Sequence, residues 1–290
     1  MDAFSQQVLA GIATGSIYAS VALALVMIYQ TTHHVNFAQG EMAMFSTFIA
    51  WTLIQAGLPY WWAFAATVAI SFVLGAAIEL LIMRRLKDSP VLSWVVVSIG
   101  LLVVFHSLAG WIFDYNIKSF PSPFPSNDGL GASFMSPHDL GAIGVTFVML
   151  ALLFAFFRFT PLGLAMRACA QNPVSSRLVG IRVGWILALG WGLAGALGAI
   201  GGMMVAPVVY LDPHMMSGVL IYAFAAALLG GIDSPLGAVL GGFVVGVLEN
   251  LIGTYAIGTE LKLSVALVLI VAVLTVRPSG LLGKVHVVRV

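Results

Sequence analysis

The stretch WILALGWGLAGALGAIGGMMVAPV, residues 185–208, decides the fold class of this chain. It contains no Asp, Glu, Lys or Arg, and it exceeds the about 20 apolar residues that a helix needs to cross a lipid bilayer. Its glycines Gly192, Gly195, Gly198 and Gly201 recur at every third residue, and small residues let helices approach closely. The stretch therefore predicts a membrane-spanning helix packed against its neighbours.

The composition extends this prediction to the whole chain. Of its 290 residues, 61% are hydrophobic and only 8% are charged, which no ordinary soluble domain shows. We expect an all-α, polytopic transmembrane helical bundle of about nine spans, within bounds of about eight to ten, in a single transmembrane domain over residues 1–290. The predicted spans are 8–29, 42–57, 61–83, 91–113, 140–157, 185–208, 215–232, 235–256 and 261–276.

Three of these ranges are less regular than the rest. Those that begin at residues 42, 215 and 261 are short or flanked by charge. Broken or re-entrant helices buried in protein would give the same pattern, so both interpretations stay open for them.

Positive charge gathers in the loops expected on one side of the membrane. All 12 Lys and Arg residues except Lys118 and Lys262 fall into three segments. These residues are Arg84, Arg85 and Lys87, then Arg158, Arg167, Arg177 and Arg182, then Arg277, Lys284 and Arg289. Because Lys-rich and Arg-rich short loops stay in the cytoplasm, nine crossings place the N-terminus outside and the C-terminus inside. The stretch of about 114–139 is then an external loop.

Several helix starts share one local pattern, a capping residue followed by proline. The pairs are Ser89-Pro90, Thr160-Pro161, Asn172-Pro173 and Ser234-Pro235. Because proline suits the first helical position, the cytoplasmic loop of about 158–184 should hold two short helices. One should follow Pro161, and the other should run from Pro173 to about Val179 and end at Gly180.

Glycine pairs four residues apart indicate close helix packing. The pairs are Gly11 and Gly15, Gly198 and Gly202, Gly237 and Gly241, and Gly242 and Gly246. Such pairs are typical of helix contacts in lipid, so we interpret them as packing surfaces and not as a pathway.

A few ionisable groups fall inside the predicted spans, where they are costly and so become functional candidates. Glu249, with Asn250 beside it, lies deep in the range that begins at Pro235, and Glu41 and Glu79 lie nearer span ends. Glu249 suits a transport pathway or a buried structural hydrogen bond equally well. For His106 the pattern favours the structural interpretation.

The sequence does not indicate metal binding, nucleotide hydrolysis or nucleophilic catalysis by this chain. His33 and His34 are adjacent and would diverge on a helix, so with Glu41 they do not form a metal site, and the single Cys169 argues against a thiolate zinc site. The sequence lacks a Walker A phosphate loop and a GxSxG nucleophile elbow. We therefore expect neither a bound cofactor nor catalysis by this chain, and we expect any ATP to be used by partner subunits.

The ordered cytoplasmic loop suggests a docking surface for such a partner. Arg167 and Arg177 lie on the two short helices. The apolar residues beside them are Leu164, Val174, Leu178 and Ile181. Such a helix pair suits a groove on another protein, and the alternative is an interfacial helix on the lipid headgroups.

The chain resembles the LivH-type permeases of bacterial branched-chain amino-acid ABC importers, and the resemblance spans nearly its whole length. The motifs that carry it are Gly15-Ser16-Ile17-Tyr18-Ala19, Asn36-Phe37-Ala38-Gln39-Gly40-Glu41, the loop Gly163 to Ile181 with Met166-Arg167-Ala168, Gly230 to Ala238, and Arg277-Pro278-Ser279-Gly280-Leu281. One departure is Gln39, which stands where this family commonly has His.

The resemblance implies a permease in a bacterial inner membrane that works with partners. These are a second, related permease in a heterodimer, two cytoplasmic ATPase subunits and an extracytoplasmic solute-binding protein. The loop would couple to the ATPases, and its candidate residues are Arg158, Thr160, Pro161, Gly163, Arg167, Asn172, Arg177 and Gly180. Candidates for the translocation pathway or its gate are Asn36, Gln39, Glu41, Glu249 and Asn250.

The expected solute is a branched-chain or other hydrophobic amino acid. Related importers carry urea, short amides or other small metabolites, and these stay open as alternatives. An ion-coupled secondary transporter would use intramembrane acidic groups, for which Glu249 is the main candidate. A membrane enzyme would need a catalytic cluster that the sequence does not indicate.

Overall fold

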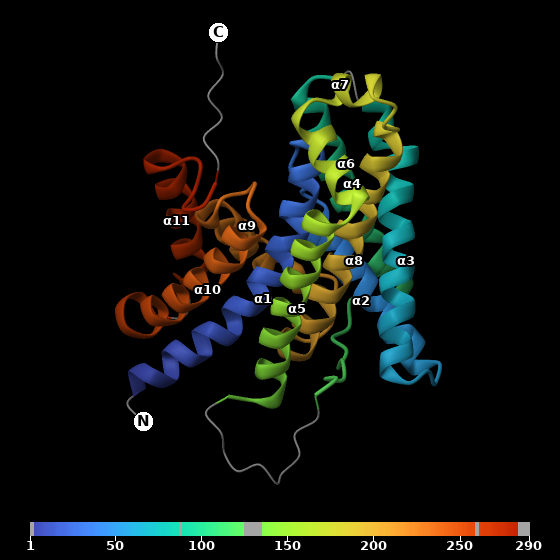
Figure 1. The fold of residues 1–290 in the computed structure, drawn as a ribbon. Helices are drawn as coiled ribbons and strands as arrows, with labels where there is room; N and C mark the ends of the chain where they lie inside the picture. Colours follow the sequence, from blue (N-terminus) through green and yellow to red (C-terminus); the bar gives the residue numbers. More distant parts are fainter. Residues whose placement is uncertain (1–2, 87–88, 125–134, 259–260, 284–290) are drawn as a thin grey trace. The chain divides into compact units, whose positions relative to one another are not determined.

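The chain folds as a helical protein, seen in a computed structural model that describes residues 3–86, 89–124, 135–258 and 261–283 (Figure 1). In chain order its elements are α1 (Ala3–Thr32), α2 (Gln39–Gln55), α3 (Tyr60–Leu81), the short helix η1 (Met83–Leu86), α4 (Val91–Phe113), α5 (Pro137–Phe159), α6 (Pro161–Gln171), α7 (Pro173–Leu178), α8 (Val183–Val209), α9 (Met215–Gly230), α10 (Pro235–Ile252), the π-helix η2 (Gly253–Ile257) and α11 (Lys262–Val276). Lys118 and Leu211 form an isolated antiparallel bridge. The predicted all-α class is confirmed for the described residues.

A helix lies at each of the nine predicted spans, but their lengths differ. Six are long and apolar enough to cross a membrane, and these are Ala3–Thr32, Tyr60–Leu86, Val91–Phe113, Pro137–Phe159, Val183–Val209 and Pro235–Ala256. The helices at the three less regular ranges are α2, α9 and α11, and α9 and α11 are apolar but shorter. Nine crossings and the orientation of the termini stay predictions, and the charges of Lys87, Lys284 and Arg289 lie outside the described residues.

The chain divides into two compact units. Unit 1 comprises residues 1–26, 124–150 and 218–290, and unit 2 comprises residues 27–123 and 151–217. The division falls within α1, α5 and α9. In unit 2, α8 packs against α3 and α2, and in unit 1, α10 packs against α11. The single transmembrane domain over the whole chain stays a prediction.

Glycine allows the helices within each unit to touch. A Cβ atom on Gly15 of α1 would lie 2.7 Å from the carbonyl oxygen of Gly242 on α10, and one on Gly11 would lie 2.6 Å from the Cα of Val247. In unit 2, a Cβ on Gly198 would lie 2.5 Å from Nε2 of Gln39. Because no side chain fits at these distances, the glycine pairs serve as packing surfaces, as predicted.

Three of the four predicted caps are confirmed. The side chains of Thr160, Asn172 and Ser234 each accept a hydrogen bond from the backbone three residues on, at the starts of α6, α7 and α10. The prediction for Ser89-Pro90 is wrong, because α4 begins at Val91 and Pro90 occupies the cap position. The carbonyl of Pro90 accepts the hydrogen bond from the backbone of Ser93, so the proline stays one residue outside the helix.

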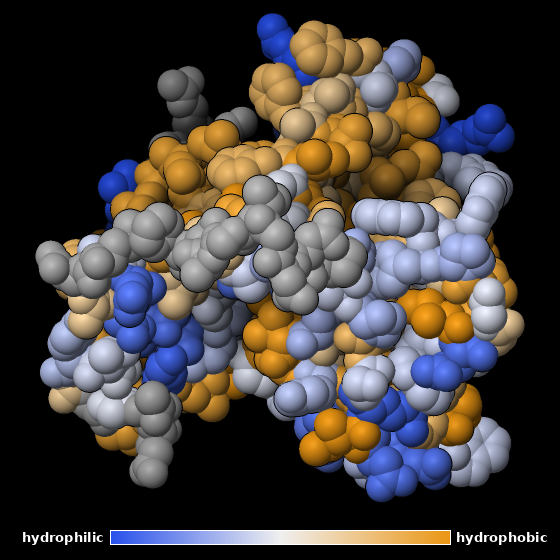
Figure 2. Space-filling view, turned by 90° about the horizontal axis from the view of Figure 1, so that it is seen from below, coloured by the Kyte–Doolittle hydropathy of each residue, from blue (hydrophilic) through white to orange (hydrophobic). Residues whose placement is uncertain are grey.

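Tryptophans mark the ends of the helices of unit 2. Trp61 and Trp62 lie at the start of α3, and Trp111 lies at the end of α4; all three are exposed. Trp185 is exposed at the start of α8. Tryptophan is enriched where lipid meets water, so this placement suits membrane-spanning helices. Figure 2 shows that hydrophilic and hydrophobic residues both reach the surface in this view.

Candidate functional site

The loop of about 158–184, which we expected in the cytoplasm, is built as two short capped helices in unit 2. Oγ1 of Thr160 accepts a hydrogen bond from the backbone of Gly163 at 3.0 Å, and Oδ1 of Asn172 accepts one from Ser175 at 2.9 Å. Gly180 follows α7 with φ of +87°, in the left-handed region that glycine tolerates. The predicted boundaries of both helices are confirmed, and we call residues 158–182 the coupling segment.

The coupling segment has a buried side and an exposed side. Its buried side chains are Met166, Cys169 and Ser176. Its exposed residues include Arg158, Leu162, Leu164, Arg167, Val174, Arg177, Leu178 and Arg182, and Leu178 is 84% exposed. Ile181, which we expected among the apolar contacts, is half-buried. An open groove of about 430 Å³, lined by Leu162, Arg182, Trp185 and Ile186, adjoins this surface.

The buried side keeps α6 against the rest of unit 2. Gly163 lies so close to the backbone of Phe156 and Phe157 that a Cβ would clash with both. Nε2 of His33, directly after α1, lies 2.8 Å from the carbonyl oxygen of Ala170 in the last turn of α6. Burial raises the pKa of the Cys169 thiol, so its reactive thiolate is scarce at neutral pH.

The start of α2 carries three of the predicted pathway residues. Asn36 stabilises the turn before α2, because its Oδ1 accepts a hydrogen bond from the backbone of Ala38 at 3.0 Å. Its Nδ2 donates to Oε1 of Gln39 at 3.3 Å, and Nε2 of Gln39 donates to the carbonyl oxygen of Ala194 on α8 at 3.0 Å. Gln39 is completely buried. The structure thus brings Asn36 and Gln39 together and fixes them to α8.

Glu41 has a different environment from its neighbours. It is 6% exposed, and its Oε2 makes no hydrogen bond although Nδ1 of His106 lies 3.4 Å away. The His106 ring lies 4.7 Å from that of His214 and 6.1 Å from that of Tyr115, centroid to centroid. His214 and Tyr115 are exposed. A polar cluster therefore leads from the surface of unit 2 to a buried carboxylate.

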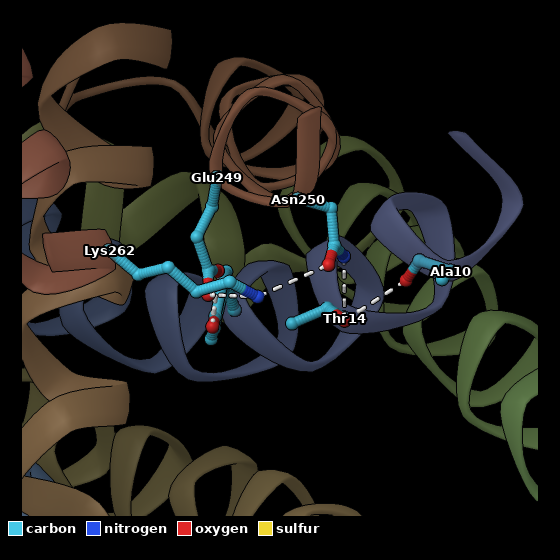
Figure 3. A network of polar contacts seen from close by, with 6 residues as sticks. Ala10, Thr14, Glu249, Asn250 and Lys262 are labelled. Atoms are coloured by element: carbon cyan, nitrogen blue, oxygen red, sulfur yellow. Dashed lines mark hydrogen bonds and ion pairs between the residues drawn. The ribbon is translucent and has the colours of Figure 1, made fainter. Parts of the chain in front are cut away.

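Glu249 and Asn250 belong to a polar network in unit 1 (Figure 3). Tyr18 on α1 donates a hydrogen bond to Oε2 of Glu249 at 2.6 Å, and Nζ of Lys262 lies 3.7 Å from Oε1. Lys262 also donates to Oδ1 of Asn250 at 3.3 Å, and Nδ2 of Asn250 donates to Thr14 at 3.5 Å. The two predicted residues share one cation, so Glu249 is paired from both sides.

Close packing shapes this network. A Cβ on Gly253, the first residue of the π-helix η2, would lie 2.6 Å from Cε of Lys262. Because Gly253 has no side chain, the aliphatic part of Lys262 has room to extend toward Glu249 and Asn250 on α10. π-Helical turns of this kind recur at functional sites.

The network includes residues that the sequence did not single out. Tyr18 lies in the motif Gly15 to Ala19, but the sequence indicates no role for its side chain. For Lys262 the sequence indicates only the side of the membrane on which it is expected. Lys262 is an isolated lysine next to a predicted span, on the side expected to carry few positive charges. That position was the one sequence feature that could have suggested an acidic partner for it. The sequence gives no pattern that predicts the contact between His214 and His106, because the two residues lie far apart in the chain and are brought together by the fold.

Two further quoted motifs meet in unit 1. The backbone of Leu281 donates to the carbonyl oxygen of Leu229, and that of Leu282 donates to Gly230. Gly231 and Gly280 both have positive φ, and a Cβ on Gly280 would lie 2.5 Å from the backbone nitrogen of Gly231. The segment after α11 is thereby fixed to the turn between α9 and α10.

The candidate residues point to binding and positioning. Among the described residues, His, Cys, Asp and Glu nowhere form a group of three that could hold a metal ion. The candidate groups are a capped surface segment, a buried amide pair and two buried carboxylates in apolar helices. Buried polar groups of this kind are typical of proteins that move solutes or ions across membranes.

Comparison with known proteins agrees with this interpretation. The branched-chain amino acid transport permease BraD of Pseudomonas aeruginosa is 32% identical and aligns over 99% of this chain and 98% of its own length. The corresponding LivH of Salmonella typhimurium is 30% identical over the same shares. PsaBC from Streptococcus pneumoniae, solved in complex with Fab, is 16% identical and shares the fold, with a TM-score of 0.50 over 96% of this chain and 94% of that chain. Residues 7–274 match the family described as branched-chain amino acid transport system / permease component, and the chain belongs to this family.

Proposed function

We propose that the chain is a transmembrane permease subunit of an ATP-driven importer, and that it carries branched-chain or other hydrophobic amino acids. The coupling segment is the observation that carries this proposal. It exposes Arg167, Arg177 and Leu178 while its other side is fixed to unit 2. An anchored helix pair with exposed cations and apolar side chains suits a groove on an energy-supplying partner.

The partners supply what the chain lacks. Two cytoplasmic ATPase subunits would bind and hydrolyse ATP, and an extracytoplasmic binding protein would deliver the solute. A second, related permease chain would complete the passage as a heterodimer. The BraD and LivH relatives, whose names state branched-chain amino acid transport, support this assignment. Urea, short amides or another small metabolite are the alternative solutes.

The topology belongs to the same proposal. About nine crossings of a bacterial inner membrane, with the N-terminus outside and the C-terminus inside, would place the coupling segment in the cytoplasm. The exposed Arg158, Arg167, Arg177 and Arg182 agree with this orientation. ATP-driven movement of the ATPases would then act directly on α6 and α7.

The candidate pathway residues take different parts in this proposal. Asn36 and Gln39 hold the start of α2 against α8. Asn250 and Glu249 are held by Lys262 and Tyr18. Glu41 has an oxygen without a hydrogen bond, so it is the strongest candidate for a gate or a solute contact.

Charge reversal on the coupling segment tests the proposal. Replacing Arg167 with Glu should weaken co-purification of the ATPase subunits at least about ten-fold, because like charges across an interface cost several kcal/mol. The matched control is Lys118→Glu, which reverses a charge in the segment expected outside, beside Trp51. ATP-dependent uptake in sealed vesicles should fall with R167E alone. Intact complexes with R167E, or uptake driven by an ion gradient without ATP, would overturn the proposal.

A further inference from the structure

The six residues between α1 and α2, together with Gln39 at the start of α2, contact three other helices of unit 2. His33 meets α6 through the carbonyl oxygen of Ala170, at 2.8 Å. The ring of His34 lies edge-on to Trp94 of α4, with 4.3 Å between centroids. At the far end, Gln39 donates to α8 through the carbonyl oxygen of Ala194, at 3.0 Å. We call residues 33–38 the α1–α2 junction.

The contact at His33 has a defined direction. A carbonyl oxygen only accepts hydrogen bonds, so Nε2 of His33 bears a hydrogen and donates the hydrogen bond to Ala170. Ala170 lies in the last turn of α6, where carbonyl groups lack partners within their own helix. His33 thus supplies a donor to the C-terminal end of α6, which is also where a positive charge is favourable.

The backbone at His33 is held in an unusual conformation. Its φ is +55°, the left-handed region that residues other than glycine seldom adopt. The ring lies edge-on to Tyr29, 5.7 Å between centroids, and its backbone nitrogen donates to the carbonyl oxygen of Tyr29 at 2.8 Å. A disfavoured conformation persists where its surroundings hold it, and one of the contacts that holds it here comes from α6.

The junction is too short to absorb a displacement of α6. It leads from His33 directly to the turn in which Asn36 bonds the backbone of Ala38 and the side chain of Gln39. Glu41 follows within the first turn of α2. A shift of Ala170 that keeps its hydrogen bond to His33 would displace this short junction, which leads into the start of α2.

We propose that the α1–α2 junction is a relay that transmits movement of the coupling segment to the start of α2, and that His33 is its positioning residue. This inference rests on the proposed function but adds a route that the function does not specify. His34 and Gln39 would pass the movement to α4 and α8. Allosteric coupling needs such a chain of contacts with two arrangements, and variants that cut the chain test it.

The first test measures uptake per ATP in liposomes that hold the assembled importer, its ATPases and its binding protein. His33→Ala should leave assembly and basal ATP hydrolysis intact and lower solute moved per ATP about five-fold, the effect of about one hydrogen bond. His33→Gln keeps a donor and should restore at least half of the coupling. Val35→Ala, in the same junction, is the control. An unchanged ratio in H33A, or an equal loss in H33Q, would refute the relay.

The second test uses the purified chain alone and so does not depend on the proposed function. Asn172→Ala removes the cap of α7 and should speed hydrogen exchange at residues 36–44 about three-fold or more when His33 is present. In combination with His33→Ala, that response should vanish. A response of equal size in both backgrounds, or no response in either, would overturn the relay. Alkylation of the buried Cys169 next to Ala170 checks that α6 stays packed in H33A.

Discussion

Glu249 on α10 and Glu41 on α2 are both buried carboxylates with a basic residue nearby, but Oε2 of Glu249 also accepts a hydrogen bond and Oε2 of Glu41 does not. Glu249 receives a hydrogen bond of 2.6 Å from Tyr18 and faces Lys262 at 3.7 Å. Glu41 faces His106 at 3.4 Å, and its Oε2 makes no hydrogen bond. Removing a partner from a paired buried carboxylate destabilises a protein, whereas a carboxylate oxygen without a hydrogen bond is available for a changing partner.

The partners themselves sharpen this contrast. Lys262 is further held by its hydrogen bond to Asn250, so the partner of Glu249 is itself fixed in place. His106, by contrast, stands next to the exposed His214, so the partner of Glu41 is close to the surface of unit 2. We therefore predict that substitutions around Glu249 act on stability, and that substitutions at Glu41 act on transport. The three predictions below run from the largest expected loss of stability to the smallest.

The largest loss is expected from Lys262→Met, which leaves Glu249 buried without its cation. Removal of one partner of a buried ion pair costs about 3 kcal/mol of unfolding free energy. The measurement is thermal or chemical unfolding in detergent. The double variant with Glu249→Gln removes the unpaired charge and should regain most of the loss. Equal stability of K262M and the native chain would show that the pair at Glu249 is not structural.

Tyr18→Phe should have an intermediate effect. It removes the hydroxyl that donates to Glu249 but keeps the ring, which is stacked on Tyr222 with centroids 4.7 Å apart. Loss of a hydrogen bond to a charged group costs about 1.5 kcal/mol in the same unfolding measurement. Tyr255→Phe removes a hydroxyl from an exposed tyrosine and serves as the control. If Y18F were as stable as Y255F, the donor at Glu249 would contribute nothing.

Local features of this fold were predictable from the sequence. Thr160 and Asn172 cap α6 and α7 as their spacing to proline indicated, because capping depends only on residues within one turn. At Ser89-Pro90 the same rule fails, because α4 begins one residue later and Pro90 occupies the cap position.

The partners of the site residues were not predictable in the same way. Tyr18 meets Glu249, and His33 meets Ala170, across long stretches of chain, and no periodic pattern encodes either contact. Gln39 attracts attention in the sequence because this family commonly has His at that position. The sequence does not show its hydrogen bond to α8, for which Gly198 leaves room. The residue types thus indicated candidate site residues, and only the structure showed which residues contact one another.

Glu41→Gln should cost the least stability, within about 0.5 kcal/mol, because it removes a buried charge and its amide oxygen can still accept a hydrogen bond from Nδ1 of His106. Uptake by the assembled importer should nevertheless fall at least about ten-fold, since an amide offers a changing partner neither charge nor a second acceptor oxygen. Glu249→Gln is the matched control, and we expect it to lower the unfolding temperature more and transport per folded molecule less. If E41Q destabilised the chain as K262M does, Glu41 would be structural too. If E249Q abolished transport without unfolding, both carboxylates would serve the pathway, and full pairing would no longer distinguish a structural carboxylate from a working one.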